Sequence, residues 1–252
     1  MMQADRSNLG SGFRRYFRVD AALDETLRDE VYRIRHEVYC EELKFEPERD
    51  DRRETDRFDA HSLHCLLSTA HEPLDLVGCA RLVCTRHDAP DVPLPFEIAC
   101  AGTLDRSIVD PARLPRHRIA EVSRLAVRGR YRQRKGEQHS PGLAQSSDFG
   151  TAERPRFPYI PVSLYLSAIS LALHAGRDIL FTLTEPRLAN HFLRLGVDIR
   201  QIGSPISHRG IRVPSMIDVK SVIRSMRSSM RPLWQAVNEE IHLGCGQAPV
   251  LH

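Results

Sequence analysis

The order of apolar segments along the chain limits the fold more than any other feature of the sequence. The first segment, Tyr16–Val19, is of strand type. Asp24 is suited to cap a helix, and the apolar residues after it recur at helical spacing, so a helix is expected from there to near Glu42. Two strand-type runs, Ser62–Thr69 and Leu76–Thr85, then follow one another across a short turn. Consecutive strands exclude the regular strand–helix alternation of a doubly wound parallel sheet.

The second half of the chain continues this mixed pattern of strands and helices. The expected elements are a strand over Arg118–Val127, a helix over Val162–Ala175, a strand over Ile179–Thr184, a helix from Pro186 to Leu195, short strands over Val197–Gly203 and Ile211–Pro214, and a helical region over Asp218–Glu240 broken or kinked at Pro232. The pattern predicts an α/β (α+β) three-layer sandwich, in which helices flank a mixed, mainly antiparallel central sheet.

The 252 residues suffice for one generous domain. We expect that domain over residues 14–217, with a C-terminal helical extension over 218–252. The Gly/Ser/Pro-rich stretch at about 137–156 shows no periodicity and predicts a mobile surface insertion.

Composition narrows the class of protein. Hydrophobic residues make up 41% and charged residues 27%, as in an ordinary globular protein, and no apolar run has the length of a transmembrane segment. The polar start of the chain does not resemble a secretory signal, so a cytoplasmic location is expected. A net charge of +3 is too small to indicate nucleic-acid binding.

The cysteines and histidines do not predict a metal site. The six cysteines contain no CxxC pair and several lie in apolar runs, which favours reduced, buried thiols. His61 and His64 are three residues apart around a strand-type run, so they are expected to face opposite sides, and no metal is predicted.

Three short motifs carry a family resemblance. They are Arg35-His-Glu-Val-Tyr39 with Phe45 downstream, Glu54-Thr-Asp56-Arg-Phe58-Asp59, and Arg81 followed by Glu121-Val-Ser123-Arg124. In this order and spacing they resemble the acyl-homoserine-lactone (autoinducer) synthases and the N-acyl amino acid synthases. The insertion and the long C-terminal region look most like the acyltransferases associated with PEP-CTERM/exosortase systems. The resemblance implies the GNAT fold and acyl transfer.

Acyl transfer to an amine requires a proton acceptor, stabilisation of an oxyanion and alignment of the substrates. Glu121 and Ser123 are expected on one strand face, with Arg124 on the other, because side chains alternate along a strand. Glu121 is a candidate to accept the amine proton through water. The alternative is an ion pair with Arg35 or Arg81, and both roles can coexist.

Asp56 and Asp59 are three residues apart, a spacing that can bring two carboxylates near one ammonium group. Helix capping or surface solvation is the alternative. Arg81 and Arg124 are candidates to bind an acceptor carboxylate through bidentate hydrogen bonds, and the sequence does not decide between them. By resemblance, the catalytic residues are Glu121, Ser123 and Asp56, and the substrate-binding residues are Arg35, Tyr39, Phe45, Asp59, Arg81 and Arg124.

A basic stretch follows the strand that carries Glu121. Its members are Arg128, Arg130, Arg132, Arg134 and Lys135. Concentrated positive charge suits a phosphopantetheine arm or an acidic carrier protein, although a solvated face is the common alternative. The resemblance favours acyl carrier protein as partner and donor over acyl-CoA, with no tightly bound cofactor.

The predicted function is therefore transfer of a medium- or long-chain fatty acyl group from a thioester to the amino group of an amino acid or related small amine. The alternatives are an acyl-homoserine-lactone synthase that uses S-adenosylmethionine, and a non-catalytic GNAT-like binding module. A tunnel for the acyl chain is expected between the central strands and the Val162–Ala175 helix.

Overall fold

The computed structural model describes residues 8–132, 158–194 and 197–246. Its sheet has eight strands, which run along the chain as β1 (Phe17–Ala21), β2 (Ser62–Thr69), β3 (Leu76–Cys84), β4 (Ile119–Val127), β5 (Ile179–Thr184), β6 (Ile199–Gln201), β7 (Ile206–Ser207) and β8 (Ile211–Asp218). The spatial order is β1-β2-β3-β4-β5-β8-β6, and β7 pairs with β8. β4 and β5 are parallel and the other pairs are antiparallel, so the predicted mixed sheet is confirmed.

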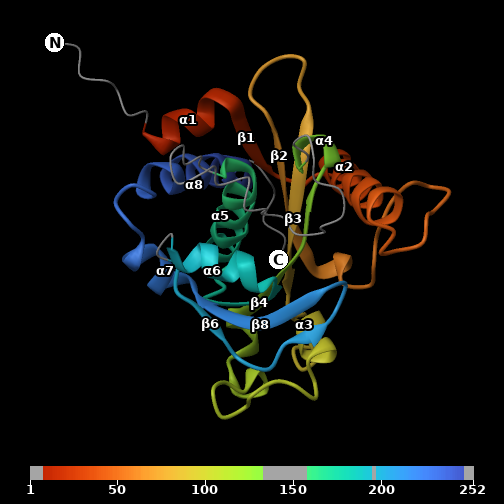
Figure 1. Ribbon diagram of the computed structural model, residues 1–252, viewed down its shortest axis with the longest axis vertical. Coiled ribbons are helices and arrows are strands. Elements are labelled where there is room, and N and C mark those ends of the chain that lie inside the picture. The colour runs from red at the N-terminus through yellow and green to blue at the C-terminus, as the bar shows by residue number, and fades with distance from the viewer. Residues whose placement is uncertain (1–7, 133–157, 195–196, 247–252) are drawn as a thin grey trace.

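Helices cover both faces of this sheet (Figure 1). The helices are α1 (Leu9–Tyr16), α2 (Glu25–His36), α3 (Pro95–Ala99), α4 (Gly129–Arg132), α5 (Tyr159–His174), α6 (Pro186–Arg194), α7 (Val219–Ser225) and α8 (Arg231–Gly246). The main core packs α1, α5 and α8 on one face, and a second cluster packs α2 on the other. No helix within the described ranges is long and apolar enough to span a membrane.

The helix that leads into the site begins and continues as the sequence predicts. Asp24 caps α2, because its carboxylate accepts the Leu27 N–H at 2.8 Å. After His36 the helix continues as one turn of π-helix, Glu37–Glu42, a form often found at functional positions. This wider turn carries Tyr39 toward β4, where its hydroxyl donates to the Leu125 carbonyl at 2.9 Å.

Some predicted bounds are wrong. α1 was not predicted, yet it buries Phe13 in the main core. β8 runs past Pro214, whose carbonyl accepts from the Ile202 N–H at 2.9 Å, so the proline does not end the strand. The C-terminal helical break lies at 226–230 rather than at Pro232. Pro232 stands in the first turn of α8, where the absent N–H costs no hydrogen bond.

The C-terminal helices share the main core with the rest of the chain. Val222 of α7, and Leu233, Val237 and Ile241 of α8, are buried in the cluster that also contains α5. The division at residue 217 stays a prediction, and the insertion at 137–156 lies outside the described residues.

Candidate active site

The predicted arginines and acids come together in a buried ion network. Its members are Arg35, Arg81, Arg124, Glu54, Asp56 and Asp59. Arg35 contacts Glu54 at 2.6 Å and Asp59 at 2.6 Å, and its side chain is fully buried. Three positive charges therefore meet three negative charges, and each arginine contacts two of the acids.

The acids of the network are ionised. Burial alone would raise the pKa of Asp59, but hydrogen bonds and charge from Arg35, and the charge of Arg81, lower it below its usual value. The pKa values of Glu54 and Asp56 are also lowered, because Arg124, together with Arg35 for Glu54 and with Arg81 for Asp56, outweighs the effect of burial. Since an uncompensated buried charge is costly, these six side chains stabilise one another as a set.

A β-bulge in β4 brings Arg124 into this network. Arg81 lies opposite Ser123, whereas Cys79, two residues earlier, lies opposite Ala126, three residues later. β4 therefore holds one extra residue here, and Arg124 has a φ of 48°. The prediction that Arg124 and Ser123 face opposite sides is wrong, because the bulge breaks the alternation on which it rested.

Glu121 stands apart from the network. Its carboxylate accepts the Phe96 N–H at 2.7 Å, and the side chain is buried. Burial raises its pKa to about 8. Arg35 and Arg81 bond to the other acids and not to Glu121, so the structure does not support the predicted ion pair.

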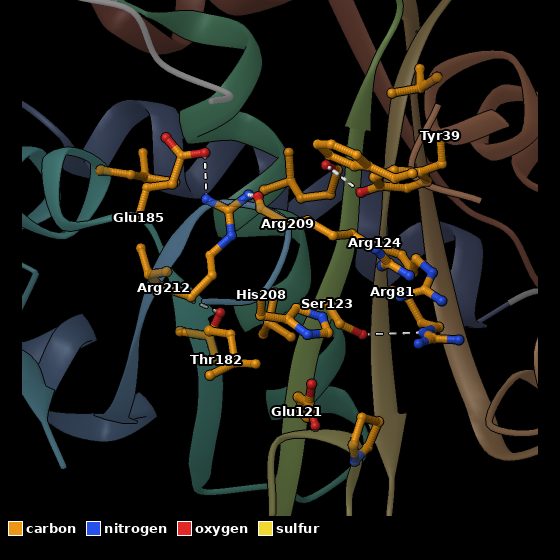
Figure 2. A pocket seen from close by; sticks show the side chains of 18 of the residues that line it. Tyr39, Arg81, Glu121, Ser123, Arg124, Thr182, Glu185, His208, Arg209 and Arg212 are labelled. Carbon is orange, nitrogen blue, oxygen red and sulfur yellow. Dashed lines mark hydrogen bonds and ion pairs between the residues drawn. The ribbon is translucent and has the colours of Figure 1, made fainter. Parts of the chain in front are cut away.

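Ser123 joins these two parts of the site. Its Oγ accepts from Arg81 Nε at 3.1 Å, as Figure 2 shows, and it lies two residues along β4 from Glu121. The predicted catalytic residues Glu121, Ser123 and Asp56 all line one cavity.

That cavity, of about 300 Å³, is a cleft where β4 and β5 diverge. The two strands pair from Ile119 with Ile179 to Val122 with Thr182 and no further. Apolar side chains line much of the cleft: Val38, Leu43, Val122, Leu125, Val127, Leu183 and Leu188. Tyr39, Phe45, Phe58 and Tyr165 add aromatic walls. Tyr165 belongs to α5, so the cavity lies between the central strands and this helix. That it holds an acyl chain stays a prediction.

The far wall of the cleft contains residues that the sequence motifs do not include. They are Thr182, Thr184, Glu185, His208, Arg209 and Arg212, from β5 and its C-terminal end and from the β7–β8 hairpin (Figure 2). A turn of Ser-His-Arg-Gly before a strand-type run was the available signal, because glycine with charged neighbours marks a hairpin tip.

The basic stretch after β4 is paired with acids. Arg128 contacts Glu37 at 3.0 Å, Arg130 pairs with Asp75, and Arg132 pairs with Glu42. Arg132 also lines the cleft. Arg134 and Lys135, predicted to join this surface, lie outside the described residues.

The histidines and cysteines were also compared with the geometry of a metal site. Among the residues that the structure describes, no group of three or more His, Cys, Asp or Glu side chains is placed to hold a metal ion. His64 is buried, and burial lowers its pKa to about 3, so its ring is neutral. All six cysteines are free thiols.

Comparison with known proteins agrees with this fold. Residues 34–140 match the acetyltransferase (GNAT) domain family. Over these residues the chain is similar to a GNAT acetyltransferase domain, and this match together with the fold indicates an acyltransferase. No curated protein matches the chain.

Solved structures of two kinds of synthase share the fold. TofI, in a ternary complex with an inhibitor and MTA, has 19% identity and a TM-score of 0.55, covering 86% of this chain and 95% of its own. BjaI, a CoA-dependent acyl-homoserine lactone synthase with SAM and isopentyl-CoA, has 19% identity and a TM-score of 0.52, covering 88% and 89%. FeeM, an N-acyl amino acid synthase from uncultured soil microbes, has 15% identity and a TM-score of 0.52, covering 83% and 95%.

Proposed function

We propose that this chain transfers a fatty acyl group from a carrier-protein or coenzyme A thioester to the amino group of an amino acid or related small amine. The observation that carries the proposal is Glu121, a buried carboxyl group with a pKa of about 8 in the wall of an otherwise largely apolar cleft. The likeness to an N-acyl amino acid synthase and to acyl-homoserine-lactone synthases supports the substrate classes.

In the proposed reaction the amine nitrogen attacks the thioester carbonyl carbon. The C–N bond forms, the C–S bond breaks, and the thiolate leaves and takes up a proton. Glu121, as the carboxylate, accepts the amine proton through a bridging water. A base is most effective when its pKa lies near the working pH, so a value of about 8 suits this task better than that of an ordinary glutamate.

Ser123 and the ion network have supporting roles in this proposal. Ser123 Oγ accepts a hydrogen bond from Arg81 Nε, so its hydroxyl hydrogen is free to be donated to another group. We propose that it is donated to the oxyanion that develops on the thioester carbonyl. Asp56 holds Arg81 and Arg124 in place at the cleft wall. Tyr39 and Phe45 pack along the substrate path.

The donor is proposed to be acyl carrier protein, with acyl-CoA as the alternative, since both present the same phosphopantetheine arm. We propose that Arg132 in the cleft wall, with exposed Arg130 two residues before it, contacts the phosphate-bearing arm as it enters the cleft. Their acidic partners reduce the net charge of this surface, so we expect moderate affinity and strong dependence on salt.

The test is mass spectrometry of reactions that contain purified protein, octanoyl or dodecanoyl thioesters on either donor, the amino acids and S-adenosylmethionine. N-acyl amino acids formed by the unmodified protein and reduced about 10²-fold or more by Glu121→Gln would support the proposal. Glu239→Gln, an exposed glutamate on α8, is the matched control. Acyl-homoserine lactone as the product would favour the synthase alternative. Absence of any acylated product would favour a binding module.

A further inference from the structure

The tip of the β7–β8 hairpin is a built part of the cleft wall. Arg209 and Gly210 both have positive φ values, 52° and 99°, and the His208 N–H donates to the Gly210 carbonyl at 2.8 Å. Arg212 donates to the Arg209 carbonyl at 3.2 Å. A non-glycine residue in the left-handed region is held there by its surroundings, so the hairpin fixes where His208 and Arg209 point.

Arg209 reaches across the cleft to Glu46, which follows the π-helical turn in the opposite wall. Both side chains are partly exposed, at 26% and 24%. Among the described residues Glu46 is the one acid paired with Arg209. In the buried network Arg35 and Arg81 contact two acids each, and Arg124 contacts three. Arg209 therefore has more capacity for a further anion than the network arginines have.

Exchange of the Arg209 partner is also less costly than exchange in the network. If a ligand took an arginine from Asp59 or Glu54, it would leave a buried carboxylate with one arginine partner instead of two. Glu46 also keeps a positive neighbour when Arg209 turns to another anion, because it lies 3.8 Å from Arg124, and unlike those two acids it is partly exposed to water. Its partial exposure lowers the cost further.

We infer that Arg209, assisted by His208, binds the carboxylate of an α-amino acid acceptor in place of Glu46. This inference rests on the proposed function and names the residue that selects the acceptor class. His208 and Ser123 both line the cleft, and in Figure 2 His208 is drawn toward Arg212 and Thr182, whereas Arg81 and Arg124 are drawn on the other side of Ser123. A carboxylate held at the hairpin tip leaves the amino group of the acceptor on the Glu121 and Ser123 side. Arg81 and Arg124 then serve to hold the network and not the substrate.

The test uses two product-like ligands that differ only in the carboxylate, N-octanoylglycine and N-methyloctanamide, titrated calorimetrically into the whole protein. We expect the unmodified protein to bind N-octanoylglycine at least about tenfold tighter than the amide. Arg209→Gln should remove this preference and leave the affinity for the amide unchanged. Glu46→Gln should increase the preference, because it removes the competing carboxylate.

Each other outcome of this titration contradicts the inference. Equal binding or no binding of the two ligands by the unmodified protein would overturn it. Weaker binding of both ligands to Glu46→Gln would also overturn it. That effect is expected if the ion pair between Arg209 and Glu46 only holds the two walls of the cleft together. Arg14→Gln, which removes an exposed ion pair with Glu239 far from the cleft, controls for loss of a positive charge.

Binding of these ligands does not depend on turnover, so the two proposals fail separately. A carboxylate preference that depends on Arg209, without acyl transfer in any reaction mixture, would leave the anion site standing and refute the enzyme. Acyl transfer that acts equally on glycine and methylamine, and is unaffected by Arg209→Gln, would support the enzyme and refute the anion site.

Discussion

Glu121 lies in surroundings that conflict with the usual ionised state of its side chain. A carboxyl group with a pKa raised from 4.5 to about 8 favours the folded state only while it is protonated. The backbone N–H of Phe96 fixes its orientation without neutralising it. The buried network solves the opposite problem, because there each acid lies against arginines that keep it ionised.

The first prediction concerns stability. The folded protein holds the Glu121 proton more tightly than the unfolded chain, so this contribution is complete below pH 4.5 and is lost as pH rises toward 8. The Glu121→Gln variant does not ionise, so it avoids this loss of stability at high pH, and its amide oxygen can still accept the Phe96 N–H. We expect it to be more stable than the unmodified protein by roughly 3 kcal/mol at pH 8, and by much less near pH 5. Urea denaturation across this range measures the difference, and a constant difference would contradict the assignment.

The second prediction concerns rate. If the carboxylate form of Glu121 accepts the amine proton, kcat/KM rises tenfold per pH unit below about pH 8 and levels off above it. Ionisation of the amine itself adds a second dependence, so acceptors of different amine pKa are compared. A change of slope near pH 8 in the pH–rate profile that is common to all acceptors and absent in Glu121→Gln identifies Glu121 as the titrating group. A limb that follows the acceptor pKa alone assigns it to the substrate.

The third prediction compares the stability contributed by the buried ion network with that contributed by a surface ion pair. Arg35→Met leaves Glu54 and Asp59 without a main partner in a buried site, and should cost about 3–5 kcal/mol of unfolding free energy. Arg33→Met, which removes the exposed pair with Asp29, should cost far less, because water screens a surface ion pair. Chemical denaturation of both variants provides the comparison. Equal, small losses would show that the network is dispensable for stability.

Among secondary-structure elements, those with strong local signals were predicted well. β2, β5 and the start of α2 lie where alternation, apolar runs and the Asp24 cap placed them. The bulge at Arg124 was not predictable, because an inserted residue leaves no mark on composition or spacing. It is nevertheless the feature that gathers Arg124 with the acids, so a one-residue irregularity decides which side chains form the site.

A close approach of β3 and β4 accompanies this bulge and supports the fourth prediction. A Cβ on Gly78 would lie 2.5 Å from the Ala126 carbonyl oxygen, which is backbone and cannot move aside cheaply. Gly78→Ala should therefore destabilise the protein by about 1–3 kcal/mol and reduce activity by displacing the bulge. Gly102→Ala, where nothing lies within 4 Å, is the control. A neutral Gly78→Ala would show that the strands can separate without affecting the site.

The whole molecule builds its cleft from two walls of different origin. Residues of the sequence motifs, such as Arg81 and Glu121, form one wall and part of the floor, and they were recognised because their order and spacing are distinctive. The other wall comes from β5, α6 and the hairpin at His208, far along the chain and without such a motif. Only the fold brings these segments together, which is why the sequence motifs include residues of the first wall and none of the second.

The last prediction belongs to the whole cleft. Leu188 of α6 is 7% exposed and lines the cavity, together with Tyr165 of α5. If an acyl chain occupies this apolar end, Leu188→Trp fills part of its space, and preference should shift from dodecanoyl to shorter donors. Each methylene that no longer fits costs about tenfold or more in relative kcat/KM. Competition between donors of different length, read by mass spectrometry of the products, measures the shift.

A matched substitution on the same helix distinguishes this effect from damage to α6. Leu193 is 48% exposed and is not among the cleft residues, so Leu193→Trp should leave the chain-length preference unchanged. A uniform loss of rate in Leu188→Trp at every chain length would place the acyl chain elsewhere. A loss of rate that is confined to long chains would instead show that the acyl chain of the donor lies against α6. With the acceptor carboxylate at the hairpin tip, the two substrates would then approach Glu121 and Ser123 along different parts of the cleft.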